Sequence, residues 1–263
     1  MAGGGAAMSN PRPSSRIRIS TDFWEQVRAA LTPVKPDIMM LAEASKPELL
    51  TNAFDIDYAW PLHGTLNEVL LNGKPATELR RSWEESLRQF PQGSLHLRFS
   101  DNHDETRAVA RFGIRGALAA EVLMLTLDGV PLLYNGMEVG DATESGDPAL
   151  FEKLPVFWSP KERPPLRVIY RDLIRLRKAH AAFRSGEVMW VKNSKEENVV
   201  SFERRAGTEA FLVVINFSSR PCQVRVDGSD AKTFTPMKLT GTRSDGQLPN
   251  IELNGFEWRI YRR

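Results

Sequence analysis

The chain has 263 residues, of which 41% are hydrophobic and 26% are charged, so it can form one large domain or two ordinary ones with a packed core. Lys and Arg number 35 against 33 Asp and Glu, and the resulting net charge of +2 gives no long-range field of the kind that nucleic-acid binding needs. No segment approaches the ~20 consecutive apolar residues of a membrane span. The composition predicts a globular protein with neither a nucleic-acid nor a membrane partner.

The single cysteine, Cys222, excludes an intrachain disulfide and a thiolate-rich zinc site, and the four histidines lie far apart in the sequence. We therefore expect no metal and no cofactor. Residues 1–20 are rich in Gly, Ala, Ser and Pro, lack any acidic residue and lack the apolar core of a secretory signal. They are predicted to be a disordered tail of a cytoplasmic protein, unless an upstream segment carries an export signal.

Hydrophobic periodicity predicts a helix that begins near Asp22, with Asp22 as its cap and Glu25 as the reciprocal partner. A short buried strand, residues 38–42, follows and ends in Glu43. Further along, helices near 63–71 and 76–89 and a long helix over 106–127 alternate with strands at 95–99 and 132–134.

An amphipathic helix follows, with Leu166, Ile169, Leu173 and Leu176 on one face. Beyond Phe183 the pattern changes to short segments rich in Val, Ile, Phe and Trp, separated by turn residues, at 187–192, 198–204, 210–217, 221–226 and 256–262. This change predicts a domain boundary near 184–186, with alternating strands and helices before it and antiparallel strands after it.

Two acidic residues, Glu43 and Asp104, are predicted at the carboxyl ends of parallel strands, where α/β folds place their working residues. Cleavage of a glycosidic bond needs two carboxyl groups that flank the bond. On position alone, both acids could equally be solvated or helix-capping residues.

Three strings resemble segments of the α-amylase superfamily of glycoside hydrolases in order and spacing. Met-Leu-Ala-Glu-Ala at 40–44 is similar to the end of that family's fifth barrel strand, and Phe-Ser-Asp-Asn-His-Asp at 99–104 to the end of the seventh. The string at 129–138, Gly-Val-Pro-Leu-Leu-Tyr-Asn-Gly-Met-Glu, resembles the eighth-strand segment. The resemblance spans about residues 21–263.

The resemblance implies a partial (β/α)₈ TIM barrel, about strands five to eight, over residues 21–185 and an antiparallel β-sandwich over 186–263. It implies Glu43 as the proton donor, Asp104 as the carboxylate that stabilises the transition state, and His103 as a hydrogen-bond donor to a sugar hydroxyl. The implied partner is an α-linked glucan or oligosaccharide. His103 could instead be a structural histidine, and Tyr134 and Glu138 are interpreted as scaffold residues.

The sequence departs from the family at the nucleophile, an aspartate at the end of the fourth strand in a Gly-Phe-Arg-x-Asp string. No Asp or Glu precedes Asp22 here, and Asp22 is placed as a helix start. The first four barrel units have no counterpart. We therefore expect an inactive chain that exposes an open barrel edge, through which it could associate with itself.

Two alternatives remain open at this point. One is a non-catalytic carbohydrate-binding remnant that uses His103, Asp104 and aromatic residues such as Trp190, and the other is a truncated gene product without an independent role. Dinucleotide, phosphate-loop, serine-hydrolase and zinc-protease signatures do not occur.

Overall fold

A computed structural model of the protein describes residues 19–144, 153–158, 165–228, 231–243 and 245–263. Apart from Ile19 and Ser20, the predicted tail lies outside the described residues. None of the helices in the described ranges is long and apolar enough to cross a membrane.

Four short strands form a parallel sheet in the order β1-β2-β3-β4, so β1 and β4 are its edges. Their bounds are Leu41–Ala42 for β1, Ile56–Tyr58 for β2, Leu95–Arg98 for β3 and Val130–Pro131 for β4. Because all neighbouring pairs are parallel, the carboxyl ends of the four strands meet at one edge of the sheet. This edge carries the candidate site.

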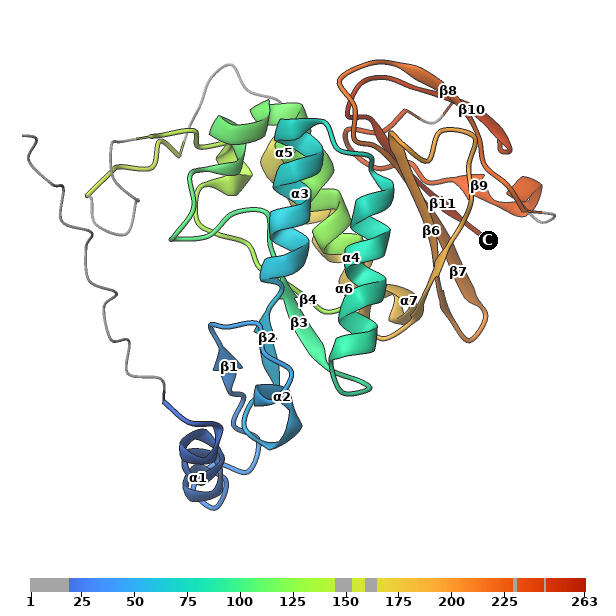
Figure 1. Cartoon of the computed structure of the whole chain (residues 1–263). Coiled ribbons are helices and arrows are strands. Elements are labelled where there is room, and N and C mark those ends of the chain that lie inside the picture. The colour runs from blue at the N-terminus through green and yellow to red at the C-terminus, as the bar shows by residue number, and fades with distance from the viewer. Residues whose placement is uncertain (1–18, 145–152, 159–164, 229–230, 244) are drawn as a thin grey trace, which may run out of the picture.

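Helices precede, separate and follow these strands (Figure 1): α1 (Thr21–Leu31), α2 (Leu49–Asn52), α3 (Trp60–Asn72), α4 (Thr77–Gln89), α5 (Ala108–Thr126), η1 (Met137–Val139), α6 (Leu166–Ala179) and α7 (Ala181–Arg184). The predicted apolar face of α6 is confirmed, because Leu166, Ile169, Leu173 and Leu176 are all buried. By contrast, α1 buries no residue, and in Figure 1 it lies beside α2, away from α3 to α6.

Antiparallel strands make up the C-terminal part, in a five-stranded sheet of order β5-β6-β7-β11-β9 and a two-stranded sheet of β10 and β8. The strands are β5 (Glu187–Trp190), β6 (Val199–Ala206), β7 (Glu209–Asn216), β8 (Cys222–Arg225), β9 (Thr235–Pro236), β10 (Asn250–Leu253) and β11 (Trp258–Arg262), with a short helix η3 (Ala231–Thr233).

The two faces of the five-stranded sheet enter different cores. On β7, Phe211 and Val213 belong to a core shared with the helices, whereas Leu212 and Val214 belong to a core shared with the two-stranded sheet. The alternation follows from the period of two along a strand. The C-terminal sheet is thereby fixed directly against α5 and α7.

Three arginines from different elements bind the turn that ends α5. Arg177 Nη1 donates to the carbonyls of Leu125 at 3.0 Å and Leu127 at 2.9 Å, and Arg98 Nη2 pairs with Asp128 Oδ1 at 2.9 Å. Arg204, from β6, donates to the carbonyl of Thr126 at 2.8 Å. Cations at a helix C-terminus satisfy its free carbonyls and oppose its dipole.

Two predictions about the N-terminal segment were wrong in detail. Ser20 rather than Asp22 caps α1, accepting from the Phe23 amide at 3.3 Å, while Glu25 accepts from Asn52. The strand at 38–42 has only two residues, and Met39 is 65% exposed. Its apolar run looked buried, but an edge strand has neighbours on one side only.

β2 was not predicted from the sequence, and an acidic residue, Asp57, lies at its centre. Asp57 is buried on β2 and bonds His96 Nδ1 at 2.5 Å, so a partner on the adjacent strand makes this acidic residue acceptable in the sheet. The strand predicted at 132–134 lies instead at Val130–Pro131.

We predict that Arg204→Met destabilises the protein. Arg204 is fully buried, and its Nη2 also donates to the carbonyls of Phe183 at 3.3 Å and Gly186 at 2.9 Å. Its loss leaves three carbonyls, those of Thr126 and Phe183 buried and that of Gly186 partly buried, without this donor and should lower the free energy of unfolding by about 3 kcal/mol. Urea denaturation followed by circular dichroism measures the change.

The matched control is Arg225→Met, also on a β-strand. Arg225 is 65% exposed and pairs with Asp227 at 3.3 Å, so its loss should cost less than about 1 kcal/mol. Equal losses in the two variants would contradict a special role for Arg204.

Candidate active site

Glu43 follows directly after β1. The start of this strand is held by the Asp55 carboxylate, whose Oδ2 accepts from the Met40 amide at 2.7 Å and pairs with Arg28 at 2.6 Å. Because β1 is an edge strand, the Glu43 side chain remains 53% exposed.

His103 and Asp104 lie in the loop between β3 and α5, which hydrogen bonds fold back on itself. Asn102 Oδ1 accepts from the Asp104 amide at 3.0 Å, and Asp101 Oδ2 accepts from the Ala108 amide at 3.2 Å, at the start of α5. Asp101 therefore supplies the acceptor that a helix N-terminus needs. Burial raises the pKa of Asp101 to about 6, although the Ala108 amide and Arg107 act in the opposite direction.

Two arginines clamp the same loop. Arg111 Nε donates to the Thr106 carbonyl at 2.7 Å and its Nη2 to the Ser100 carbonyl, so one guanidinium spans the loop. Arg107 Nη2 pairs with Asp141 at 3.2 Å, and its Nη1 donates to the Asn135 carbonyl at 2.8 Å, which ties the loop to the segment after β4. The loop is thus fixed at both ends.

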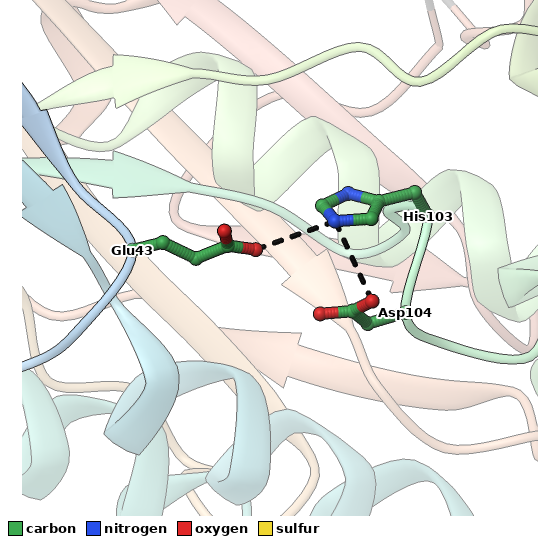
Figure 2. Close-up of side chains that lie close together, drawn as sticks. All are labelled: Glu43, His103 and Asp104. Atoms are coloured by element: carbon green, nitrogen blue, oxygen red, sulfur yellow. Dashed lines mark ion pairs between the residues drawn. The ribbon is translucent and has the colours of Figure 1, made fainter. Parts of the chain in front are cut away.

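The fold brings the three predicted site residues together (Figure 2). His103 Nε2 lies 3.3 Å from Glu43 Oε1 and 3.4 Å from Asp104 Oδ1. One ligand atom from each residue lies within 4.8 Å of the other two. In Figure 2 the two carboxylates approach the ring from different segments and meet at one nitrogen.

The exposure of these groups bears on what they can bind. The side chains of Glu43, His103 and Asp104 are 53%, 32% and 43% exposed, so they can reach a molecule from solvent. Carboxylates and an imidazole at this spacing suit a ligand with several hydroxyl groups. They would also admit a cation, but exposed acidic groups often lie this close without one, and the predicted absence of a metal stays a prediction.

An aromatic cluster beside the site was missed by the sequence analysis. Tyr58, at the end of β2, stacks on Trp60 with ring centroids 5.5 Å apart, and both contact Phe99. Burial raises the pKa of Tyr58, and the negative charges of Glu43 and Asp104 raise it further. The alternation of residues 54–60, ending in two aromatic residues, was the available signal.

The group of Glu43, His103 and Asp104 does not include Tyr134, Asp22 or Trp190. Tyr134 lies 4.5 Å from the Arg107 guanidinium, and Asp22 lies in the first turn of α1, outside the cluster. Trp190, considered above as a sugar-binding aromatic residue, packs against Trp83 and Phe202 at centroid distances of 5.8 and 5.4 Å. It is partly buried and packs against the shared core, and its role in sugar binding stays a prediction.

Comparison with known proteins identifies the family. The family model for the alpha-amylase catalytic domain matches residues 14–203. The chain therefore belongs to the α-amylase family of glycoside hydrolases, whose catalytic domain has the TIM-barrel fold.

Among characterised relatives, the chain is 24% identical to the alpha-amylase MalA of Haloarcula japonica over 238 residues, which cover 87% of this chain and 34% of the relative. It is 26% identical to a cyclomaltodextrinase of Geobacillus thermopakistaniensis over 234 residues, or 86% of this chain and 39% of the relative. The chain thus spans about a third to two-fifths of these relatives.

Solved structures agree on the fold. The maltogenic alpha-amylase AmyB of Thermotoga neapolitana superposes with a TM-score of 0.80 at 24% identity, covering 94% of this chain and 59% of AmyB. A cyclomaltodextrinase superposes with a TM-score of 0.79 at 22% identity, covering 92% of this chain and 43% of the other.

We predict that Glu43→Gln lowers the pKa of Tyr58. Ionisation of the phenol adds a negative charge next to existing ones, so removal of the Glu43 charge makes this ionisation easier. Ultraviolet titration of the phenolate, with Tyr58→Phe as the reference that identifies its signal, measures the shift. In Glu48→Gln, which removes an exposed acid of the same segment, the pKa should stay unchanged.

Proposed function

We propose that the chain carries the proton-donor side of a retaining glycosidase site that acts on an α-linked glucan or glucoside. Glu43 is the general acid, Asp104 stabilises the positive charge that develops at the sugar ring, and His103 donates a hydrogen bond to a sugar hydroxyl. The names of the relatives, α-amylase and cyclomaltodextrinase, support this class of substrate.

One observation carries this proposal. Two carboxylates from separate strand ends meet at His103, with one oxygen of each within 4.8 Å of the other, so both can face one sugar ring. At the open edge of a parallel sheet, two carboxylates beside one histidine suit a polar ligand such as a sugar ring.

The proposed chemistry has two halves, of which this chain supplies one. In a retaining reaction a carboxylate attacks the anomeric carbon while an acid protonates the departing oxygen. Glu43 can supply the proton, but no Asp or Glu precedes Asp22 to act as the attacking group. We infer that residues 21–185 correspond to about strands five to eight of the barrel, residues 186–263 to a β-sandwich domain, and that the isolated chain is inactive.

We predict negligible cleavage of phenyl α-maltoside by the pure chain, and cleavage that depends on added azide. Azide attacks the anomeric carbon, the bond to the phenoxide oxygen breaks, Glu43 gives its proton to that oxygen, and β-maltosyl azide and phenol form. Glu43→Gln should reduce this rate by about 100-fold or more, since general acids typically contribute that much. Chromatography of the two products measures it.

The matched substrate is 2,4-dinitrophenyl α-maltoside, whose leaving group departs without a proton. Its azide-dependent cleavage should survive Glu43→Gln and fall in Asp104→Asn. Cleavage without azide that Glu43→Gln abolishes would reveal another nucleophile in the chain. Binding of maltoheptaose without any azide-dependent cleavage would favour the alternative, a carbohydrate-binding remnant.

We also propose that the chain associates with itself through the β1 edge. Among the described residues, this edge strand pairs only with β2, and Leu41 within it and Met39 just before it are 38% and 65% exposed. Unpaired backbone groups next to apolar side chains favour strand pairing between molecules.

We predict that sedimentation velocity at low micromolar concentration shows dimers or larger species, and that Leu41→Lys shifts them towards monomer. Val34→Lys is the control, because Val34 is 81% exposed but lies outside the strand. A wild-type monomer that unfolds cooperatively and binds no apolar dye would contradict the proposal.

A further inference from the structure

A buried carboxylic acid lies beneath the loop that carries His103 and Asp104. Glu121, on α5, is fully buried, and its Oε2 accepts a hydrogen bond from Ser100 Oγ at 2.8 Å. Its Oε1 has no hydrogen-bond partner within the described part of the chain. The proposed glycosidase chemistry makes no use of this residue, yet an acid in the interior is costly unless it serves a purpose or stays neutral.

The contact with Ser100 leads directly to the site. Ser100 is followed by Asp101, which caps α5, and by Asn102, whose Oδ1 holds the amide of Asp104. These three residues are at most 2% exposed, so the loop has no freedom to absorb a shift at Ser100 without moving Asp104. The position of His103 and Asp104 therefore depends on what Ser100 binds as well as on the contacts of Arg107 and Arg111.

The surroundings of Glu121 favour its neutral form. Burial, with a smaller contribution from the nearby carboxylate of Asp101 and against the effect of the Ser100 bond, raises the pKa of Glu121 to about 8. The buried phenol of Tyr170, on α6, lies in the same region and supplies no positive charge. The carboxylate of Glu138, on η1, adds a further negative charge near Tyr170. The cations Arg107 and Arg111 act on Asp101.

We propose that Glu121 is a positioning residue for the site: its protonated carboxyl holds the loop of residues 99–107 through Ser100, and its ionisation releases that loop. A second negative charge next to Asp101 in the interior is relieved when the loop moves outwards and water reaches both carboxylates. This inference rests on the proposed function only in assigning a role in sugar binding to His103 and Asp104.

The direction of the pH effect follows from proton linkage. When the loop is closed, the raised pKa of Glu121 makes its carboxyl bind more protons than when the loop is open. The closed state therefore loses stability as pH rises from the ordinary pKa of a glutamate towards about 8. Asp101, with a pKa of about 6, also destabilises the closed loop as pH rises, but at lower pH. Burial lowers the pKa of His63 to about 4, so His63 changes its charge below this range. Between pH 6.5 and 8 the trend belongs to Glu121.

Hydrogen-exchange mass spectrometry of peptides from residues 99–107 tests this proposal. After correction for intrinsic exchange, the opening constant of the wild-type loop should rise by about tenfold per pH unit between pH 6.5 and 8. In Glu121→Gln, whose amide mimics the neutral acid and still accepts from Ser100, the rise should disappear and the loop should stay protected at pH 8.

Two further variants separate this role from a general effect on folding. Glu138→Gln removes a nearby acid that bonds the Gly136 amide and not the loop, so it should keep the wild-type rise. Ser100→Ala removes the connecting hydroxyl, so it should expose the loop already at pH 6.5. This variant decides the question even if Glu121→Gln does not fold, because a fully protected Ser100→Ala loop would overturn the proposal.

Maltoheptaose affinity, measured by calorimetry at the same pH values, distinguishes the two proposals. An affinity that decreases as pH rises in the wild type, and does not change with pH in Glu121→Gln, supports both proposals. Loop opening that follows Glu121 without any sugar binding supports the positioning role and contradicts the proposed function. An equal rise of loop opening in the wild type and in Glu121→Gln overturns the positioning role, whatever the sugar result.

Discussion

The end of α5 is the point on which the two parts of the molecule depend. A helix terminus leaves carbonyls without partners, and here Arg177 from α6, Arg204 from β6 and Arg98 from β3 approach the turn of residues 125–129. Burial lowers the pKa of Arg204 to about 10, so its charge is retained at neutral pH. Because each arginine comes from a different layer, satisfying one helix end joins the parallel sheet, the helices and the antiparallel sheet.

The opposite end of α5 positions the site by the same principle. Asp101 accepts from the first amide of the helix, and Arg111 of α5 holds the Ser100 and Thr106 carbonyls. The loop that carries His103 and Asp104 is therefore an extension of the helix terminus. Its geometry is fixed by hydrogen bonds to buried groups, which explains how a segment at the molecular surface can hold an imidazole between two carboxylates.

The site combines a rigid side with an open one. The side of His103 and Asp104 rests on the core through Ser100 and Glu121, whereas Glu43 projects from an edge strand of two residues. The aromatic cluster of Tyr58, Trp60 and Phe99 joins the end of β2, the start of α3 and the segment after β3.

The sequence by itself determined the apolar face of α6 and the strand at residues 95–98, because local periodicity depends on residues close together in the chain. It also determined the motifs that contain Glu43, His103 and Asp104, which the fold brings together. It did not determine β2, since the burial of Asp57 requires His96 from the next strand, nor the exposure of Met39, which depends on β1 lying at a sheet edge. Only the tertiary structure placed Glu121 beneath Ser100 across 21 residues, and packed Trp190 against the core. Such pairings are decided by which surfaces meet, and periodicity along the chain carries no information about that.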